Sequence, residues 1–206
     1  IPFAHGGQAW QDATVFEAVA MGIGGNNYYK NCYVDLKESC LRSETTVKVF
    51  DQMRKLQSYT DEGSPGRDWN VATGMVIEGK AGFQIMGDWA KGEFTAAGKV
   101  PGVDYYCAPT PSNNGYLYNV DSFIFYKTSD PEKQEGQKLL AKLMMGKNFQ
   151  KVFNLYKGSI PARLDVPMDE FDKCAKTSNS DIKTAGASGG LVPSFAHGMA
   201  QGNTMK

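Results

Sequence analysis

A carboxylate and an indole stand side by side in the segment Gly79–Glu93. Here the apolar run Phe83–Met86 leads through a glycine to Asp88 and Trp89. We interpret the run as a strand that turns into a helix, and in α/β proteins ligands bind where strands end. An aromatic face beside a carboxylate suits a sugar ring, which has one apolar face and a rim of hydroxyls. Asp88 either accepts hydrogen bonds from such hydroxyls or caps the helix that comes after it.

A second polar pair, Asn119 and Asp121, lies two residues apart in the predicted strand Tyr118–Tyr126. Alternate residues of a strand share a face, so the two side chains offer donors and acceptors to neighbouring hydroxyls. Charged acceptors bind hydroxyls more strongly than neutral ones. The alternative is that Asp121 is a solvated acid at the end of the strand.

Carboxylates also allow an enzymatic interpretation. A glycoside hydrolase needs two acids at a suitable separation, and Asp88, Glu93 and Asp121 are the candidates. A third alternative is an interaction domain that binds no small ligand. A nucleophilic triad is disfavoured because the sequence has no Gly-x-Ser-x-Gly motif and only two histidines, His5 and His197. The same scarcity of histidine argues against a metal site.

Composition excludes several other classes of protein. The chain has 206 residues, of which 41% are apolar, enough for a hydrophobic core. Lys and Arg number 22, as do Asp and Glu, so the formal net charge is zero and neither nucleic acid nor an anionic membrane is the expected partner. No apolar stretch is long enough for a transmembrane helix. Because the chain starts at Ile1, we expect a mature, processed or fragmentary protein.

The four cysteines lack the C-x-x-C spacing of zinc and redox sites. An even number of cysteines fits two disulfides and an oxidising compartment, although four reduced buried thiols remain an alternative. Of the three possible connectivities we favour Cys32–Cys40, which closes a short loop, together with Cys107–Cys174.

Helical periodicity predicts a helix over 12–21 with Asp12 as its N-cap, and the glycines of 22–27 would end it. A second helix should begin at Ser43 or Glu44, and a later one, over about 132–145, at 129–131. Strands interspersed among such helices predict an α/β fold. Two buried faces are predicted. The second helix forms one with Val47, Phe50, Met53, Leu56 and Gln57, and the helix over 132–145 forms the other with Leu139, Leu140, Leu143 and Met144.

Several motifs occur along the chain in the same order as in a known family. The chain resembles the bacterial extracellular sugar-binding proteins of ABC importers, and most closely the periplasmic glucose-binding proteins of Pseudomonas-like bacteria. Each motif alone is weak, but together they span the whole chain. The motifs are Ala4-His-Gly-Gly-Gln-Ala-Trp10, Trp69-Asn-x-Ala-Thr-Gly, Glu78-Gly-Lys-Ala-Gly-Phe, Met86-Gly-Asp-Trp-Ala, Lys157-Gly-Ser-Ile-Pro-Ala-Arg163 and Ser194-Phe-Ala-His-Gly198.

This resemblance implies a type II periplasmic-binding-protein fold, in which two α/β lobes enclose the sugar. The chain matches only about the C-terminal half of such a protein. The resemblance implies that 1–104 form the first part of the C-terminal lobe and that 105–118 cross over to the N-terminal lobe. Residues 119–148 would complete the N-terminal lobe, and 149–206 would cross back and finish the C-terminal lobe. The segment 119–145 would then have an unpaired edge, to be covered by the missing N-terminal half or by a second copy.

The resemblance also implies roles for particular residues and partners. Trp89 would stack on a monosaccharide, most simply glucose with galactose or mannose as alternatives, and Asn119, Asp121, Lys157 and His197 would bond its hydroxyls. His5, Gln8 and Trp10 are weaker candidates near the crossing point. The expected protein is periplasmic, delivers its sugar to an ABC permease, needs no cofactor and catalyses nothing. The chain by itself should bind sugar weakly.

Overall fold

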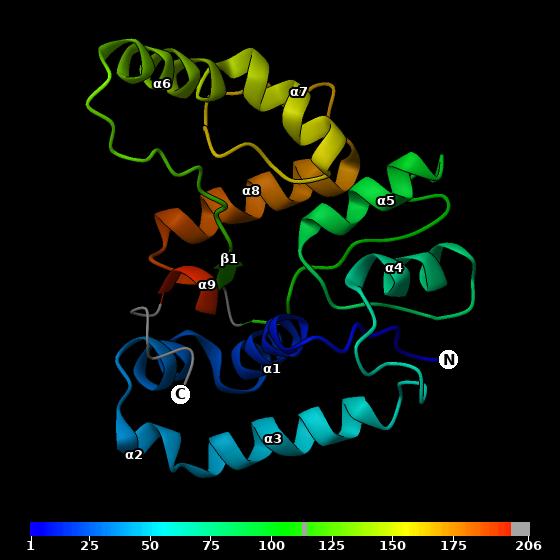
Figure 1. The fold of residues 1–206 in the computed structure, drawn as a ribbon. Coiled ribbons are helices and arrows are strands. Elements are labelled where there is room, and N and C mark those ends of the chain that lie inside the picture. Colours follow the sequence, from blue (N-terminus) through cyan, green and yellow to red (C-terminus); the bar gives the residue numbers. More distant parts are fainter. Residues whose placement is uncertain (113–114, 199–206) are drawn as a thin grey trace.

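The computed structural model describes residues 1–112 and 115–198 and is dominated by helices (Figure 1). One turn, η1, is a π-helix and another, η2, is a 3₁₀ helix. The elements are α1 (Ala9–Tyr29), η1 (Lys30–Val34), α2 (Glu38–Leu41), α3 (Glu44–Gln57), α4 (Trp69–Ile77), η2 (Asp88–Ala90), α5 (Lys91–Ala96), β1 (Tyr116–Tyr118), α6 (Pro131–Met144), α7 (Lys147–Lys157), α8 (Lys173–Ala187), β2 (Leu191–Pro193) and α9 (Phe195–Gly198).

Figure 1 shows α6 and α7 at one end of the molecule, α1 and α3 at the other, and α8 between them. Beside α8, β1 and β2 form a two-stranded parallel sheet in which Leu117 pairs with Val192. The main hydrophobic core lies between α1, η1, α3 and β2, where Met21, Tyr29 and Val49 are fully buried. The α/β prediction therefore holds in its coarse form, as helices around a small parallel sheet.

The first helix is longer than predicted. It begins at Ala9 with Gln8 as its N-cap, so Asp12 lies in its first turn and caps nothing. It also continues through the glycines expected to end it, with one break at Gly25, where φ is +72°. Burial explains the continuation, because Met21 and Tyr29 on either side of the break both belong to the core.

Helix α3 begins where the sequence predicts, with the Ser43 hydroxyl accepting from the Thr46 N–H at 3.4 Å. Its predicted buried face is wrong in part. Val47 and Phe50 are 59% and 54% exposed, whereas Thr46 and Val49 point into the core. The predicted stripe is displaced around the helix axis because α1 packs against the neighbouring face.

Both favoured disulfides are present. Cys32 and Cys40 have Cα atoms 5.2 Å apart, and those of Cys107 and Cys174 are 5.8 Å apart, both within the usual range. The first bond staples η1 to α2 within the main core. The second ties an extended segment to the start of α8, across 67 positions of sequence.

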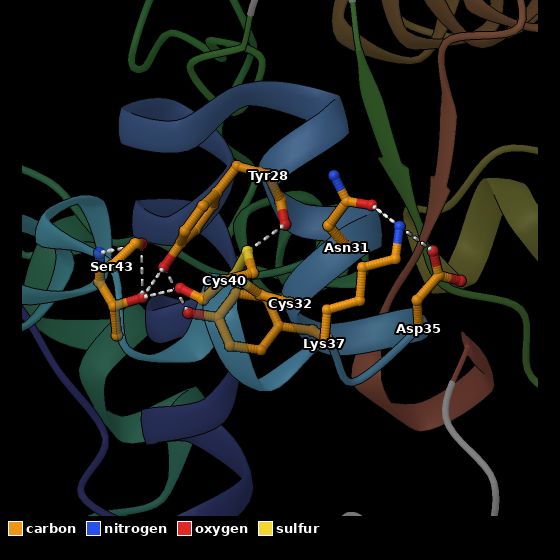
Figure 2. Close-up of a disulfide and its surroundings, with 9 residues drawn as sticks. Tyr28, Asn31, Cys32, Asp35, Lys37, Cys40 and Ser43 are labelled. Atoms are coloured by element: carbon orange, nitrogen blue, oxygen red, sulfur yellow. Dashed lines mark hydrogen bonds and ion pairs between the residues drawn. A yellow bond between two sulfur atoms is a disulfide. The ribbon is translucent and has the colours of Figure 1, made fainter.

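Figure 2 shows how the short disulfide loop is closed on its other side. The Lys37 ammonium lies 2.5 Å from the Asn31 amide oxygen and 3.5 Å from an Asp35 carboxylate oxygen. These contacts cross the turn that joins Cys32 to Cys40. The loop is therefore held by one covalent bond and by polar contacts on its exposed side.

Two predicted strands are wrong. Residues 83–86 are extended but pair only once, through the bridge between Phe3 and Phe83. The strand predicted over 118–126 ends at Tyr118, and 119–127 have no regular structure. A strand needs a neighbour to satisfy its N–H and C=O groups, and no such neighbour exists for this segment within the part of the chain that is described.

The start of α6 is as predicted, with Pro131 at its first position and the Asp130 side chain as N-cap. Its predicted buried stripe is wrong except for Met144. Leu139, Leu140 and Leu143 are between 48% and 61% exposed, because no described element covers that side of the helix.

Candidate functional site

One groove of about 1580 Å³ lies between the α6–α7 end of the molecule and the elements around α5, β1 and α8. It is lined by five of the residues that the sequence predicts to bind a ligand. They come from segments far apart in the chain and are Asp88, Trp89, Asn119, Asp121 and Lys157.

The Lys157 ammonium forms an ion pair with the Asp121 carboxylate across 36 positions of sequence. Lys157 is the last residue of α7, so helix geometry determines where its side chain starts. Its ammonium also lies 5.8 Å from the centre of the Phe153 ring, one turn earlier. The pair places a donor and an acceptor together at the groove wall, which is an arrangement that adjacent hydroxyls can bridge.

Asp88 opens η2 and does not cap it. Its carboxylate instead accepts from the Ile160 N–H at 3.1 Å and from the Ser159 hydroxyl. Burial is the largest influence and raises the pKa of Asp88, whereas these hydrogen bonds and the charges of Lys91 and Lys157 oppose the rise. Asp88 thus joins the Gly-Asp-Trp-Ala turn to the loop after α7.

A close backbone approach holds these two motifs together. Gly158 has φ of +88° and ends α7, and its N–H bonds the Asn154 carbonyl. A Cβ atom on Gly158 would lie 2.5 Å from the Gly92 nitrogen, and one on Gly92 would lie 2.8 Å from the Lys157 oxygen. Only glycines permit this contact, which sets the position of Lys157 relative to η2.

Trp89 is half-buried, and its ring folds back over Gly87, where a side chain would collide with the indole. Gly87, which precedes Asp88, therefore leaves the space into which the Trp89 indole packs. The ring remains part of the groove lining, so one aromatic surface is available there.

Asn119 lies directly after β1, where its amide oxygen accepts from the Ser194 hydroxyl at 3.0 Å. Ser194 precedes α9, so this bond links the groove to the helix that contains His197. The side chain of His197 lies outside the described part of the structure.

The three weaker candidates lie elsewhere. His5 bonds Asp12 at 2.7 Å, and Gln8 accepts from the Trp10 indole at 2.8 Å and donates to Asp68. None of the three lines the groove. They form a polar network at the start of α1.

Other polar groups around this site do not stand out in the sequence. Tyr116 and Ser178 line the groove and share a hydrogen bond of 2.6 Å, and the buried carboxylate of Glu17 holds the start of α9. Alternation in β1 is the sequence signal for Tyr116, because Leu117 faces the core.

Among the described residues, no three His, Cys, Asp or Glu side chains gather as a metal site would require. No described helix is long and apolar enough to cross a membrane.

Residues 3–180 match the family model described as bacterial extracellular solute-binding protein. The chain belongs to this family. The match covers every residue that lines the groove except Asp181 and Ile182, which lie in the second half of α8.

Relatives of this solute-binding protein come from bacteria and archaea. A probable sugar-binding periplasmic protein of Brucella suis biovar 1 is 48% identical over 206 residues, 100% of this chain and 48% of that protein. One of Rhizobium meliloti is 47% identical over 206 residues, covering 100% of this chain and 49% of the relative. An ABC transporter extracellular-binding protein of Pyrococcus horikoshii, described as uncharacterized, is 32% identical over 201 residues, which cover 97% of this chain and 44% of that protein. The chain spans about half the length of these relatives.

These relatives bear on the enzymatic alternative. None of the three is described as a glycoside hydrolase. In this solute-binding protein Glu93 does not line the groove, while Asp121 is paired with Lys157. Neither observation favours a catalytic pair of acids.

Proposed function

We propose that this chain supplies the groove in which a periplasmic solute-binding protein of an ABC importer binds a monosaccharide, glucose in the first instance. The observation that carries the proposal is the convergence of Asp88, Trp89, Asn119, Asp121 and Lys157 on one surface. Two relatives that cover the whole chain are described as probable sugar-binding periplasmic proteins. Galactose and mannose differ from glucose in single hydroxyl orientations and are the alternative ligands.

The groove provides two kinds of contact. Stacking of an apolar sugar face on Trp89 removes apolar surface from water, worth roughly 25 cal/mol per Å². Asn119, Asp121 and Lys157 then bond the hydroxyl rim, and Asp88 lies at the junction of the two motifs. A sugar with a misplaced hydroxyl leaves buried polar groups unpaired, which is how such a site discriminates epimers. His197 belongs to the same proposed set.

Two lobes complete this proposal. Residues 1–104 and 149–206 would form one lobe, 105–118 the crossover, and 119–148 a part of the other lobe. The exposed leucines of α6 support this division, since an apolar face of that size is normally covered. The remaining part of the second lobe, or a second copy, would cover it. Sugar would shift the population towards a closed form, which the permease recognises.

Calorimetric titration of the full-length protein with D-glucose, D-galactose and D-mannose tests the proposal. We expect saturable binding, tightest for one of the three, and weaker binding by the 206-residue chain on its own. Flat titrations with all three sugars would exclude the function. Release of a chromophore from aryl glycosides would instead favour the enzymatic alternative.

A further inference from the structure

The first residue of β1 places a phenol in the groove. Leu117 packs against the main core, so the residues on either side of it face the opposite way. The Tyr116 side chain accordingly crosses to α8, where its hydroxyl lies 2.6 Å from the Ser178 hydroxyl. Both residues line the groove that contains Asp88 and Trp89.

The side of α8 that faces the groove is polar. Thr177 and Ser178 are adjacent in α8, and Asp181 follows them one helical turn later; all three line the groove. Their hydroxyls and carboxylate are half-buried or exposed, and none belongs to the hydrophobic clusters on either side of the helix. This polar strip continues the surface formed by the predicted ligand residues.

Burial and two nearby carboxylates keep the phenol of Tyr116 protonated. Burial is the largest effect and raises the pKa of Tyr116, and the carboxylates of Asp88 and Asp181 act in the same direction. The bond to Ser178 opposes this rise. Two neutral hydroxyls that share one hydrogen bond leave one proton to donate and oxygen lone pairs to accept. A sugar hydroxyl likewise donates and accepts, so the pair matches it in either orientation.

We propose that Tyr116 and Ser178 form a specificity-determining pair that binds one hydroxyl of the monosaccharide, in the groove that Asp88 also lines. This inference rests on the proposed function and adds a contact to the same site. The pair selects for a hydroxyl at one ring position because its own proton and lone pairs would be left unsatisfied by a sugar that lacks the group.

The test compares D-glucose with its monodeoxy analogues in the full-length protein, for the wild type, Tyr116→Phe and Ser178→Ala. The wild type should bind one analogue about tenfold more weakly than glucose, as expected for one lost hydrogen bond. Both variants should weaken glucose binding by a similar factor yet bind that one analogue as the wild type does. Tyr156→Phe and Ser180→Ala are matched controls outside the groove and should change nothing.

Each outcome separates the inference from the function on which it rests. If the wild type binds glucose and both variants bind all the sugars equally well, the pair makes no contact and the inference is wrong. A uniform loss for every analogue would assign the pair a structural role and overturn it as well. Thermal melting of each variant checks that the fold is retained, and Phe preserves the ring packing of Tyr116. Absence of any sugar binding by the wild type would remove both proposals together.

Discussion

The Glu17 carboxylate accepts a hydrogen bond of 2.8 Å from the backbone N–H of Phe195, which lies 178 positions later in the chain. Phe195 is the first residue of α9, and its ring stacks on Tyr29 at 5.7 Å. The Tyr29 hydroxyl also donates to Glu17, at 3.4 Å. A buried acid in α1 therefore fixes the short helix next to the groove.

Replacement of Glu17 by Gln should change how stability depends on pH. Burial above all raises the pKa of Glu17 from 4.5 to about 7, although the bonds from Phe195 and Tyr29 lower it. The folded state thus holds the Glu17 proton more tightly than the unfolded state does. The stabilisation from the protonated Glu17 side chain is therefore complete below pH 4.5 and is lost as pH rises through about 7. The wild type should lose roughly 3 kcal/mol relative to Glu17→Gln over this range. Urea denaturation of both proteins at several pH values measures the difference, and parallel curves would contradict it.

Removal of the Lys157 charge should weaken sugar binding without much effect on stability. We expect Lys157→Met to lower the affinity for glucose about tenfold or more, since a charged hydrogen bond is worth roughly 1.5–3 kcal/mol. Its pair with Asp121 is partly solvated, so the free energy of unfolding should change by less than about 1 kcal/mol. Lys151→Met is the matched control. Lys151 lies on the same helix, has the same 28% exposure and is paired with Glu170, but does not line the groove. Equal titrations for the two variants would refute the role of Lys157.

Gly158→Ala should separate the two motifs that meet beside the groove. The substitution places a Cβ 2.5 Å from the Gly92 nitrogen at a φ of +88°. A left-handed conformation costs roughly 1–2 kcal/mol, and overpacking adds roughly 1–3 kcal/mol. Gly98→Ala tests the first cost alone, because Gly98 has φ of +70° with nothing within 4 Å. Urea denaturation should show that Gly158→Ala lowers the free energy of unfolding clearly more than Gly98→Ala does. Similar losses in both variants would mean that the backbone contact is unimportant.

The two disulfides should differ in accessibility and in their effect on stability. Cys107 is exposed, whereas Cys32 is fully buried. Mild reduction followed by alkylation should therefore label Cys107 and Cys174 first, as detected by peptide mass spectrometry. By chain entropy, loss of the long-range bond should cost about 4.4 kcal/mol and loss of the short one about 2.5 kcal/mol. Labelling in the reverse order would contradict the burial of Cys32.

Local features were predictable where neighbouring residues alone determine them. Ser43 and the 129–131 turn supply side-chain oxygens or a fixed φ at helix starts, and the structure confirms both starts. Glycines are ambiguous signals. The glycines of 22–27 are predicted to end α1, but the chain remains helical on both sides of Gly25 because the flanking aromatic and aliphatic residues are buried.

Longer-range features depended on what each segment packs against. The leucines of α6 have the spacing of a buried stripe, yet periodicity only indicates a face and supplies no partner for it. The same limit affected 119–127, which alternates like a strand but has no pairing neighbour among the described residues. Strand pairing is a long-range contact, so sequence pattern could not decide it.

By itself the sequence determined the chemistry of the candidate site, because an indole, two carboxylates, an amide and an ammonium are properties of residue types. It also indicated the family and the favoured disulfides. Only the tertiary structure decided which residues meet. It brought Asp121 to Lys157 and Tyr116 to Ser178, and it left His5, Gln8 and Trp10 in a separate network. The reason is that such meetings depend on backbone contacts such as that of Gly92 with Gly158, which join segments far apart in the chain.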